Sequence, residues 1–164
     1  MNEPKQREVE RLVQTYSDMV LRLSYSYLKS VYDAEDICQT VFLNLLTAGV
    51  TFESPTHEKA YLIRATINAC KNELKAFRRK LLPLDEVRET AVQSIPSTEV
   101  LDAVMALPRA YREAIYLFYY EGYAIGEIAD LLGISPSAAA AHLSRGRKKL
   151  RIALGESYEQ KLST

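Results

Sequence analysis

No stretch of the sequence stays apolar for the roughly 18 residues that a membrane-spanning helix needs. Residues 1–11 are charged and lack the apolar core of a secretory signal peptide. Tryptophan is absent, and the two cysteines, Cys38 and Cys70, do not have the spacing of metal ligands. We therefore expect a reduced, cytoplasmic protein that does not insert into a membrane, with both cysteines packed in a core rather than acting as redox switches.

Histidine is as rare as cysteine. His57 falls at the start of one predicted helix and His142 inside another. Neither has the neighbours that a catalytic triad or a metal site requires. The sequence therefore predicts no catalytic residues, no metal site and no cofactor, and we do not expect an enzyme.

Apolar residues, by contrast, make up 48% of the 164 positions, and 11 residues are tyrosine. The apolar residues recur with a helical period nearly throughout. The period fades only at residues 81–97, which contain Pro83 and Pro96 and several acidic side chains. We expect an all-α protein of two small helical bundles, residues 1–80 and 98–164, joined by a flexible acidic linker at 81–97.

The net charge is zero, but the charges are unevenly distributed. Residues 61–80 contain six basic and one acidic side chain, and residues 142–164 contain six basic and two acidic ones. Residues 81–105, between them, contain one basic and five acidic side chains. Two basic segments separated by an acidic one indicate two separate contacts with a polyanion.

Three helices are expected in the first bundle. The first covers residues 5–30, and the third starts at Ser54 and Pro55 and runs to about Lys80. The apolar positions of the first helix keep a helical period: Val9, Leu12, Val13, Tyr16, Val20 and Leu23.

The second expected helix covers residues 34–48, with Asp33 as its N-cap and Gly49 at its end. It would bury three apolar residues: Ile37, Val41 and Leu45. Its other side carries two polar residues and an aromatic one: Asp36, Gln39 and Phe42. An aromatic ring beside exposed polar groups indicates a protein-docking face, but the spacing fits equally well with Phe42 packed in the core.

The third helix is two-sided. Five apolar residues form a seam: Ile63, Ile67, Cys70, Leu74 and Phe77. A polar stripe begins near Tyr61 and repeats this spacing one residue further on: Arg64, Asn68, Lys71, Lys75 and Arg78, widened by Asn72 and Arg79. Cations can hold phosphates and an aromatic ring can stack on a base, so the stripe fits single-stranded nucleic acid. The alternative is a solvated helix face, which the near-absence of acids (only Glu73) disfavours.

Start and stop signals divide the last bundle into helices. Ser97 would cap a short first helix. Pro108 suits the first position of the next, which Gly122 can end in a left-handed conformation. Gly133 can end a third helix, and Ser135 can cap the last.

The last two of these helices are joined by a tight turn, and the second is strongly basic, which is the plan of a helix-turn-helix. The inward residues of the first would be Ile125, Ile128, Ala129 and Leu132. Those of the second would be Ala139, Leu143, Gly146, Leu150 and Ala153. Its basic residues are Arg145, Arg147, Lys148, Lys149 and Arg151. A generic three-helix core with a solvated charged end is the alternative, but turn, caps and one-sided charge agree with the helix-turn-helix.

Motifs in both bundles resemble the sigma-70 family, in its extracytoplasmic-function group. Residues 33–43, Asp-Ala-Glu-Asp-Ile-Cys-Gln-Thr-Val-Phe-Leu, are similar to the family signature D-A-E-D-x-x-Q-x-V-F-L. Residues 107–108, 122–129 and 132–135 resemble the second domain of the family, and residues 143–150 match its L-x-R-x-R-x-x-L ending. The resemblance covers nearly all of both bundles.

The resemblance implies a sigma factor that binds core bacterial RNA polymerase and directs promoter recognition. Its partners would be the beta-prime clamp helices and the beta flap of the polymerase, promoter DNA and an anti-sigma factor. The polymerase-docking residues would be Asp36, Gln39, Phe42 and Leu43. The −10 element would be held by Tyr61, Arg64, Asn68, Lys71, Asn72, Lys75, Arg78 and Arg79. The −35 element would be contacted by Ser135, Ser137, Ala138, His142, Arg145, Arg147 and Lys148.

The sequence departs from the family at two places. Tyr61 stands where many relatives have tryptophan, and it still offers a stacking ring. Residues 138–143 read Ala-Ala-Ala-Ala-His-Leu where the family often has T-V-K-S-R-L, so Ala140 and His142 replace the lysine and arginine that could read guanine. We therefore expect a −35 contact that depends on backbone contacts and DNA shape. The alternative function is a free-standing helix-turn-helix regulator, whose tight binding to duplex DNA the alanine-rich helix disfavours.

Overall fold

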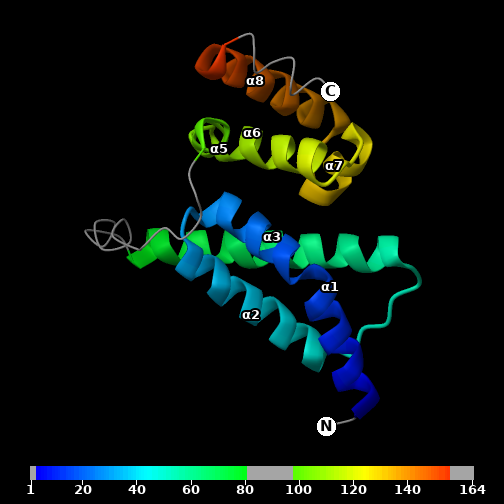
Figure 1. Ribbon diagram of the computed structural model, residues 1–164. Coiled ribbons are helices and arrows are strands. Elements are labelled where there is room, and N and C mark those ends of the chain that lie inside the picture. Colours follow the sequence, from blue (N-terminus) through cyan, green and yellow to red (C-terminus); the bar gives the residue numbers. More distant parts are fainter. Residues whose placement is uncertain (1–2, 81–97, 156–164) are drawn as a thin grey trace. The chain divides into compact units, whose positions relative to one another are not determined.

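The computed structural model describes residues 3–80 and 98–155, and every regular element in these residues is a helix (Figure 1). The expected all-α class is confirmed. The chain divides into two compact units, residues 1–94 (unit 1) and 95–164 (unit 2). The expected linker at 81–97, including the expected cap at Ser97, lies outside the described residues. Among the described helices, none is long and apolar enough to cross a bilayer.

Unit 1 is a bundle of α1 (Glu3–Leu28), α2 (Val31–Ala48) and α3 (Pro55–Lys80), each packed on the other two (Figure 1). Its apolar core draws on all three helices: Leu12, Val20, Leu23, Ile37, Val41, Leu62, Ile63 and Ile67. Burial of each such side chain stabilises the fold by roughly 1.5–3 kcal/mol. The inward faces expected for α2 and for the centre of α3 are confirmed, whereas Val9 and Val13 at the start of α1 are only half-buried.

Helix α2 begins earlier than the sequence predicts. Ser30, rather than Asp33, is its N-cap, because the Ser30 Oγ accepts a hydrogen bond of 3.1 Å from the backbone N–H of Asp33. Asp33 lies in the first turn, where a carboxylate interacts favourably with the positive end of the helix dipole. The other end is as expected, since Gly49 closes the helix with a φ of 67°.

A buried carboxylate ties α1 to the first turn of α3. Glu58 is 6% exposed and accepts hydrogen bonds from Arg11 Nη2 (2.9 Å) and Nη1 (3.3 Å) and from the Tyr16 hydroxyl (2.6 Å). The hydrogen bonds from Arg11, and then that from Tyr16, hold the pKa of Glu58 below its ordinary value against the opposing effect of burial. The start of α3 is therefore attached to α1 by a charge-assisted contact as well as by apolar packing.

Unit 2 consists of α5 (Glu99–Met105), α6 (Arg109–Ile115), the π-helical turn η1 (Tyr116–Tyr120), α7 (Ile125–Leu132) and α8 (Pro136–Leu154). Its core cluster is Leu107, Ile115, Leu143, Leu150 and Leu154. Helix α8 contacts α5, α6 and α7, so it is the element around which unit 2 is assembled.

The caps of unit 2 agree with the sequence except at two positions. Thr98, and not the expected Ser97, caps α5, and its Oγ1 accepts a hydrogen bond of 3.0 Å from the backbone N–H of Leu101. Pro108 lies one residue before α6, as its N-cap, instead of at its first position. Gly122 and Gly133 adopt the expected left-handed conformation, with φ of 77° and 68°.

The inward faces of α7 and α8 differ from the prediction at one residue each. Ile125, the first residue of α7, is exposed. In α8, Leu154 is buried where Ala153 was expected. A stripe continued from Leu150 can pass through i+3 or i+4, and the larger Leu154 side chain is the one that reaches the core.

The turn η1 was not predicted. The backbone N–H of Glu121 bonds to the carbonyl of Tyr116 at 3.2 Å, five residues earlier. Such wide turns are rare and occur frequently at functional sites. In unit 2 it presents two adjacent aromatic residues, Phe118 and Tyr119, to the core cluster that includes α8.

Two adjacent charged residues of α6 are buried. Arg112 donates from Nη1 to the backbone carbonyl of Leu107 at 2.7 Å, which satisfies a carbonyl in the turn between α5 and α6. Glu113 is 9% exposed, and burial raises its pKa to about 7.

Because Glu113 is buried, we expect the free energy of unfolding of unit 2 to fall as the pH rises. Between its ordinary pKa of 4.5 and the raised value of about 7, the folded chain keeps a proton that the unfolded chain releases. The free energy of unfolding of unit 2 should therefore fall, by at most roughly 3 kcal/mol, as the pH increases through this interval. Hydrogen exchange of unit 2 amides, corrected for the intrinsic pH dependence, measures this fall. Glu113→Gln should flatten the profile, and an unaltered profile in that variant would contradict the assignment.

Candidate partner-docking and nucleic-acid interfaces

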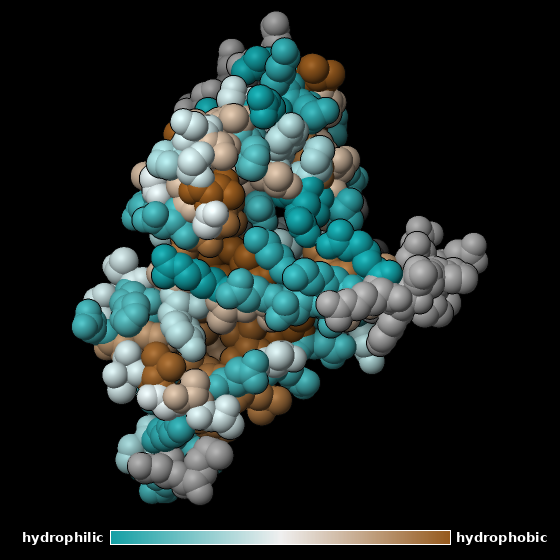
Figure 2. Space-filling model, turned by 180° about the vertical axis from the view of Figure 1, so that it is seen from behind, coloured by the Kyte–Doolittle hydropathy of each residue, from teal (hydrophilic) through white to brown (hydrophobic). Residues whose placement is uncertain are grey.

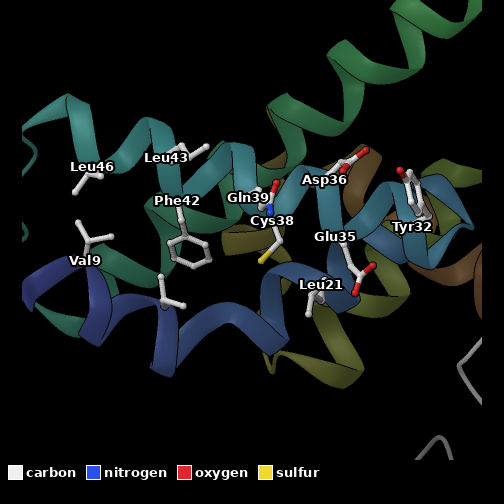
Figure 3. A pocket seen from close by; sticks show the side chains of 11 residues that line it. Val9, Leu21, Tyr32, Glu35, Asp36, Cys38, Gln39, Phe42, Leu43 and Leu46 are labelled. Atoms are coloured by element: carbon white, nitrogen blue, oxygen red, sulfur yellow. The ribbon is translucent and has the colours of Figure 1, made fainter. Parts of the chain in front are cut away.

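Helices α1 and α2 line a groove on unit 1 with a volume of about 620 Å³ (Figure 3). One end is apolar and is lined by Val9, Phe42, Leu43 and Leu46. The other end carries Tyr32, Glu35 and Asp36. A groove with one apolar and one acidic end is suited to an amphipathic partner helix that carries basic residues.

The four expected docking residues differ in exposure. Asp36 and Gln39 are exposed, and Leu43 is 61% exposed. Phe42 is only 7% exposed and points from α2 toward α1, as Cys38 does (Figure 3). Of the two readings that the sequence left open for Phe42, packing in the core is the one observed. Of the four, Leu43 is the residue whose large apolar side chain is exposed.

The two cysteines occupy different places. Cys70 is fully buried in α3, and burial raises its pKa to about 12. Cys38 lines the α1–α2 groove, and burial, assisted by the charges of Asp18 and Glu35, raises its pKa as well. Core packing is confirmed for Cys70, whereas Cys38 is half-buried. Both thiols stay protonated near neutral pH, which lowers their reactivity.

The polar stripe expected along α3 faces outward. Arg64, Asn68, Asn72, Lys75 and Arg78 are exposed and Lys71 is half-buried, and these six residues are called the α3 stripe below. The view from behind shows a band of hydrophilic side chains along this helix (Figure 2). The eighth expected residue of the −10 contact, Arg79, has its side chain outside the described residues.

Aromatic rings gather at the start of α3. The ring of Phe52, from the loop before the helix, lies edge-on to Tyr61 with centroids 5.3 Å apart and to His57 with centroids 5.4 Å apart. The Nδ1 atom of His57 accepts a hydrogen bond of 3.2 Å from the backbone N–H of Glu53, which fixes the loop. Sequence reasoning selected Tyr61 and missed Phe52. The signal was present, since three ring-bearing residues occur within ten positions.

The beginning of α8 matches the prediction. The Ser135 Oγ accepts a hydrogen bond of 3.1 Å from the backbone N–H of Ala138, so Ser135 is occupied as the N-cap. Ser137 is exposed, Ala138 and Ala140 are half-buried, and Ala139 is buried. The outer face at the start of this helix is therefore made of a serine and small methyl groups.

Two residues expected at the −35 contact are turned toward unit 2 itself. The His142 ring is half-buried, lies 5.8 Å from the ring of Tyr111, and has a buried Nδ1 with no hydrogen-bond partner among the described residues. Arg147 donates from Nε to the Tyr119 hydroxyl at 2.6 Å. Arg145 and Lys148, by contrast, are exposed. The basic end of α8 thus divides into residues that face solvent and one that contacts η1.

No group of three or more histidine, cysteine, aspartate or glutamate residues in the described part of the chain is arranged to hold a metal ion. The described residues form three notable surfaces: an apolar and acidic groove on unit 1, a basic stripe with aromatic rings on α3, and a basic helix end on unit 2.

Comparisons with known proteins agree with this division. Family models described as Sigma-70 region 2 and Sigma-70, region 4 match residues 12–80 and 97–150. The RNA polymerase sigma factor CarQ of Myxococcus xanthus is 34% identical over 132 residues, which cover 75% of each chain. The ECF RNA polymerase sigma factor SigE of Mycolicibacterium smegmatis is 28% identical over 154 residues, which cover 87% of this chain and 60% of that relative.

A solved structure shows the same fold. The sigma factor RpoE of Bartonella quintana, determined in complex with the anti-sigma factor NepR, superposes with a TM-score of 0.73 at 18% identity, covering 90% of this chain and 97% of that chain. The fold, the two family matches and the relatives agree on one conclusion. The chain belongs to the sigma-70 family, in its extracytoplasmic-function group, and is an RNA polymerase sigma factor that directs transcription initiation.

Proposed function

We propose that the α1–α2 groove and the outer edge of α2 dock on the beta-prime clamp helices of core RNA polymerase. The main support for this proposal is the exposure of Leu43, a large apolar side chain that is 61% exposed beside the polar residues Asp36 and Gln39. Protein interfaces commonly have an apolar centre and a polar rim, and Leu43 with its polar neighbours has this arrangement. The acidic end of the groove, with Glu35, favours a partner helix that carries basic residues.

The outer side of α3 is proposed to hold the melted −10 element. Cations of the α3 stripe are spaced along one side of the helix, where they can follow the phosphates of a single strand. Phe52 and Tyr61 stand together at one end, where an unpaired base can stack on an aromatic ring. The amides of Asn68 and Asn72 lie between the cations and can bond base edges.

Unit 2 is proposed to bind the −35 element as duplex DNA through α8, the recognition helix of the helix-turn-helix. Arg145 and Lys148 are exposed and available for phosphates. Ser137 is the exposed polar residue near the helix start, and the alanine methyl groups can contact thymine. Few side chains here can read bases by hydrogen bonds, so backbone contacts and DNA shape carry the selectivity.

A second groove, on unit 2, suits the beta flap of the polymerase. It has a volume of about 310 Å³ and lies between α5, the following turn and the end of α8. Its lining is mostly apolar: Ala103, Ala106, Leu107, Pro108, Lys149, Ile152 and Ala153. Ile152 is exposed, so this groove offers an apolar anchor next to the positive charge of Lys149.

We further propose that an anti-sigma factor regulates the chain and that the chain acts in the cytoplasm, where RNA polymerase works. The solved relative RpoE of Bartonella quintana was determined with its anti-sigma factor NepR, which supports this class of partner. The apolar and acidic groove of unit 1 would serve the inhibitor and the polymerase in turn.

The test is co-elution of the full chain with bacterial core RNA polymerase on a sizing column. Leu43→Asp should weaken binding at least about tenfold, because a charge replaces the apolar side chain that we propose as the anchor of the interface. Gln39→Ala should weaken it less. Tyr120→Asp is the matched control, since Tyr120 is equally exposed, at 61%, but belongs to η1 and lines neither groove.

The outcomes separate the two candidate functions. Wild-type binding by Leu43→Asp would show that the groove is not the docking surface. If the wild-type chain failed to co-elute and bound duplex DNA by itself, the free-standing regulator would be the better description.

A further inference from the structure

We propose that Arg147 is a positioning residue that fixes α8 on η1, and that it does not bind a DNA phosphate. The inference deepens the proposed −35 role of α8 and rests on it. It also reassigns a residue that the sequence pattern grouped with Arg145 and Lys148 as a phosphate contact.

The contacts of Arg147 make an aromatic clamp. Its Nε donates to the Tyr119 hydroxyl at 2.6 Å, and its Cζ lies 5.1 Å from the centre of the Phe118 ring and 5.5 Å from that of Tyr119. The two rings meet at 76° with centroids 4.9 Å apart, so the guanidinium is bounded by aromatic surfaces at a large angle to each other. A planar guanidinium combines a charge-assisted hydrogen bond with cation–π contacts in a way that an ammonium group cannot.

The π-helical turn and the glycine before Arg147 build this clamp. Phe118 and Tyr119 are adjacent residues inside η1, and both pack against the core cluster of unit 2. Gly146 lies against α6, since a Cβ at this position would be 2.9 Å from the Ile115 side chain. Helix α8 is therefore attached at two consecutive residues, by close backbone approach at Gly146 and by the guanidinium at Arg147.

Helix geometry separates Arg147 from the exposed cations. Residues two positions apart on an α-helix differ by about 200° in direction, so Arg145 points to nearly the opposite side of α8. Lys148 shares the side of Arg145, because three positions bring the helix nearly back to the same direction. Arg145 and Lys148 are exposed and Arg147 is half-buried, in agreement with these directions.

The clamp matters because the face of α8 that would read DNA is rich in alanine. Readout by backbone contacts and groove shape depends on the angle at which a helix enters the groove, since no long side chain can adjust to an error in that angle. Arg147, by fixing α8 on η1, sets that angle.

The test compares Arg147→Lys, Tyr119→Phe and the double variant, each in the full chain. Tyr119→Phe removes only the hydroxyl that accepts the hydrogen bond and keeps the ring. The first readout is affinity of the holoenzyme for a promoter duplex that it has selected from a random-sequence pool, measured over a range of salt. Arg145→Gln is the control for a phosphate contact, and it should reduce the salt slope by about 0.9.

We expect each single variant to weaken promoter affinity about fivefold. The double variant should bind the promoter as well as the more weakly binding single variant does, because both changes break the same contact. Wild-type affinity in Tyr119→Phe, or a double loss equal to the product of the single losses, would overturn the clamp. A further variant, Arg147→Gln, removes the charge at this position. A fall of about 0.9 in its salt slope, with affinity unchanged in Tyr119→Phe, would identify Arg147 as a phosphate contact.

A second readout does not depend on DNA. In nitrogen–proton NMR spectra of the full chain, the Arg147 Nε–H should exchange slowly in the wild type and rapidly in Tyr119→Phe. Rapid exchange in the wild type would overturn the clamp. If Arg145→Gln left affinity and slope unaltered while this resonance behaved as expected, the −35 proposal would fail and the attachment of α8 by Arg147 would stand.

Discussion

Replacing Glu58 with alanine is expected to lower the free energy of unfolding of unit 1 by about 1–3 kcal/mol, because the change removes the hydrogen bonds that Glu58 accepts from the buried Tyr16 hydroxyl and from Arg11, which keeps only its ion pair with Glu8. The contact with Arg11 contributes the smaller share of this loss, since the Arg11 side chain is 48% exposed and its charge is screened by water. Hydrogen exchange of amides in α1 and α3 measures the loss, with unit 2 amides as the internal reference.

Two further variants separate the contributions to this contact. Tyr16→Phe removes one hydrogen bond and should cost less than Glu58→Ala. The pKa of Glu58 is held below 4.5, its ordinary value, so its contribution is complete above that pH and is lost as the pH falls through the folded value. Glu58→Gln should remove this acid-side loss, and an acid profile equal to that of the wild type would contradict the assignment.

Glu58→Ala should also affect the three rings at the start of α3, those of Phe52, His57 and Tyr61. Glu58 lies next to His57 and one turn before Tyr61. Loss of its contact with α1 would loosen the position of these rings and of Phe52, so Glu58→Ala should weaken the proposed −10 contact without changing any residue of the α3 stripe.

Replacing Gly146 with valine is expected to lower the free energy of unfolding of unit 2 by about 3 kcal/mol. A Cβ at this position would lie 2.9 Å from Ile115 Cγ1 and 3.4 Å from Tyr111 Cβ, inside the packed interface of α6 and α8. Gly146→Ala should cost less, about 1 kcal/mol net, because alanine regains about 1 kcal/mol of helix propensity. Urea unfolding followed by hydrogen exchange of unit 2 amides measures both changes.

The chain contains a matched control for this prediction. Gly126 is also inside a helix, α7, but nothing lies within 4 Å of a Cβ built on it, and its φ is not positive. Gly126→Ala should therefore stabilise unit 2 by up to about 1 kcal/mol through helix propensity alone. If Gly146→Ala stabilised unit 2 by the same amount, α6 and α8 would not be in the close contact that the structure shows.

Much of the fold could be predicted because its signals are local. Gly49, Gly122 and Gly133 end helices where the sequence predicts, since a left-handed residue is acceptable to glycine almost without cost. Ser135 caps α8 as expected, but Ser30 caps α2 in place of Asp33. Both Ser30 and Asp33 can cap a helix, and the choice between them depends on where the turn from α1 ends.

The functional surfaces were predictable only in part. The two-sided character of α3 was readable, because a helical period separates an apolar seam from a polar stripe. The helical period indicates only approximately on which side of their helices Phe42 and Arg147 lie. Whether a neighbouring element buries that side depends on how the helices pack. Phe42 is covered by α1, and Arg147 is held by η1.

The sequence by itself determined the all-α class, most helix ends, the location of positive charge and the family signatures, because propensity, capping and periodicity act over a few neighbouring residues. Only the tertiary structure decided that Phe42 is buried while Leu43 is exposed, that Phe52 joins Tyr61, that Glu58 meets Arg11 and Tyr16, and that Arg147 lies between aromatic rings. Each of these facts depends on which element lies opposite the residue, and residues 47 positions apart in sequence, such as Arg11 and Glu58, meet only when the helices pack.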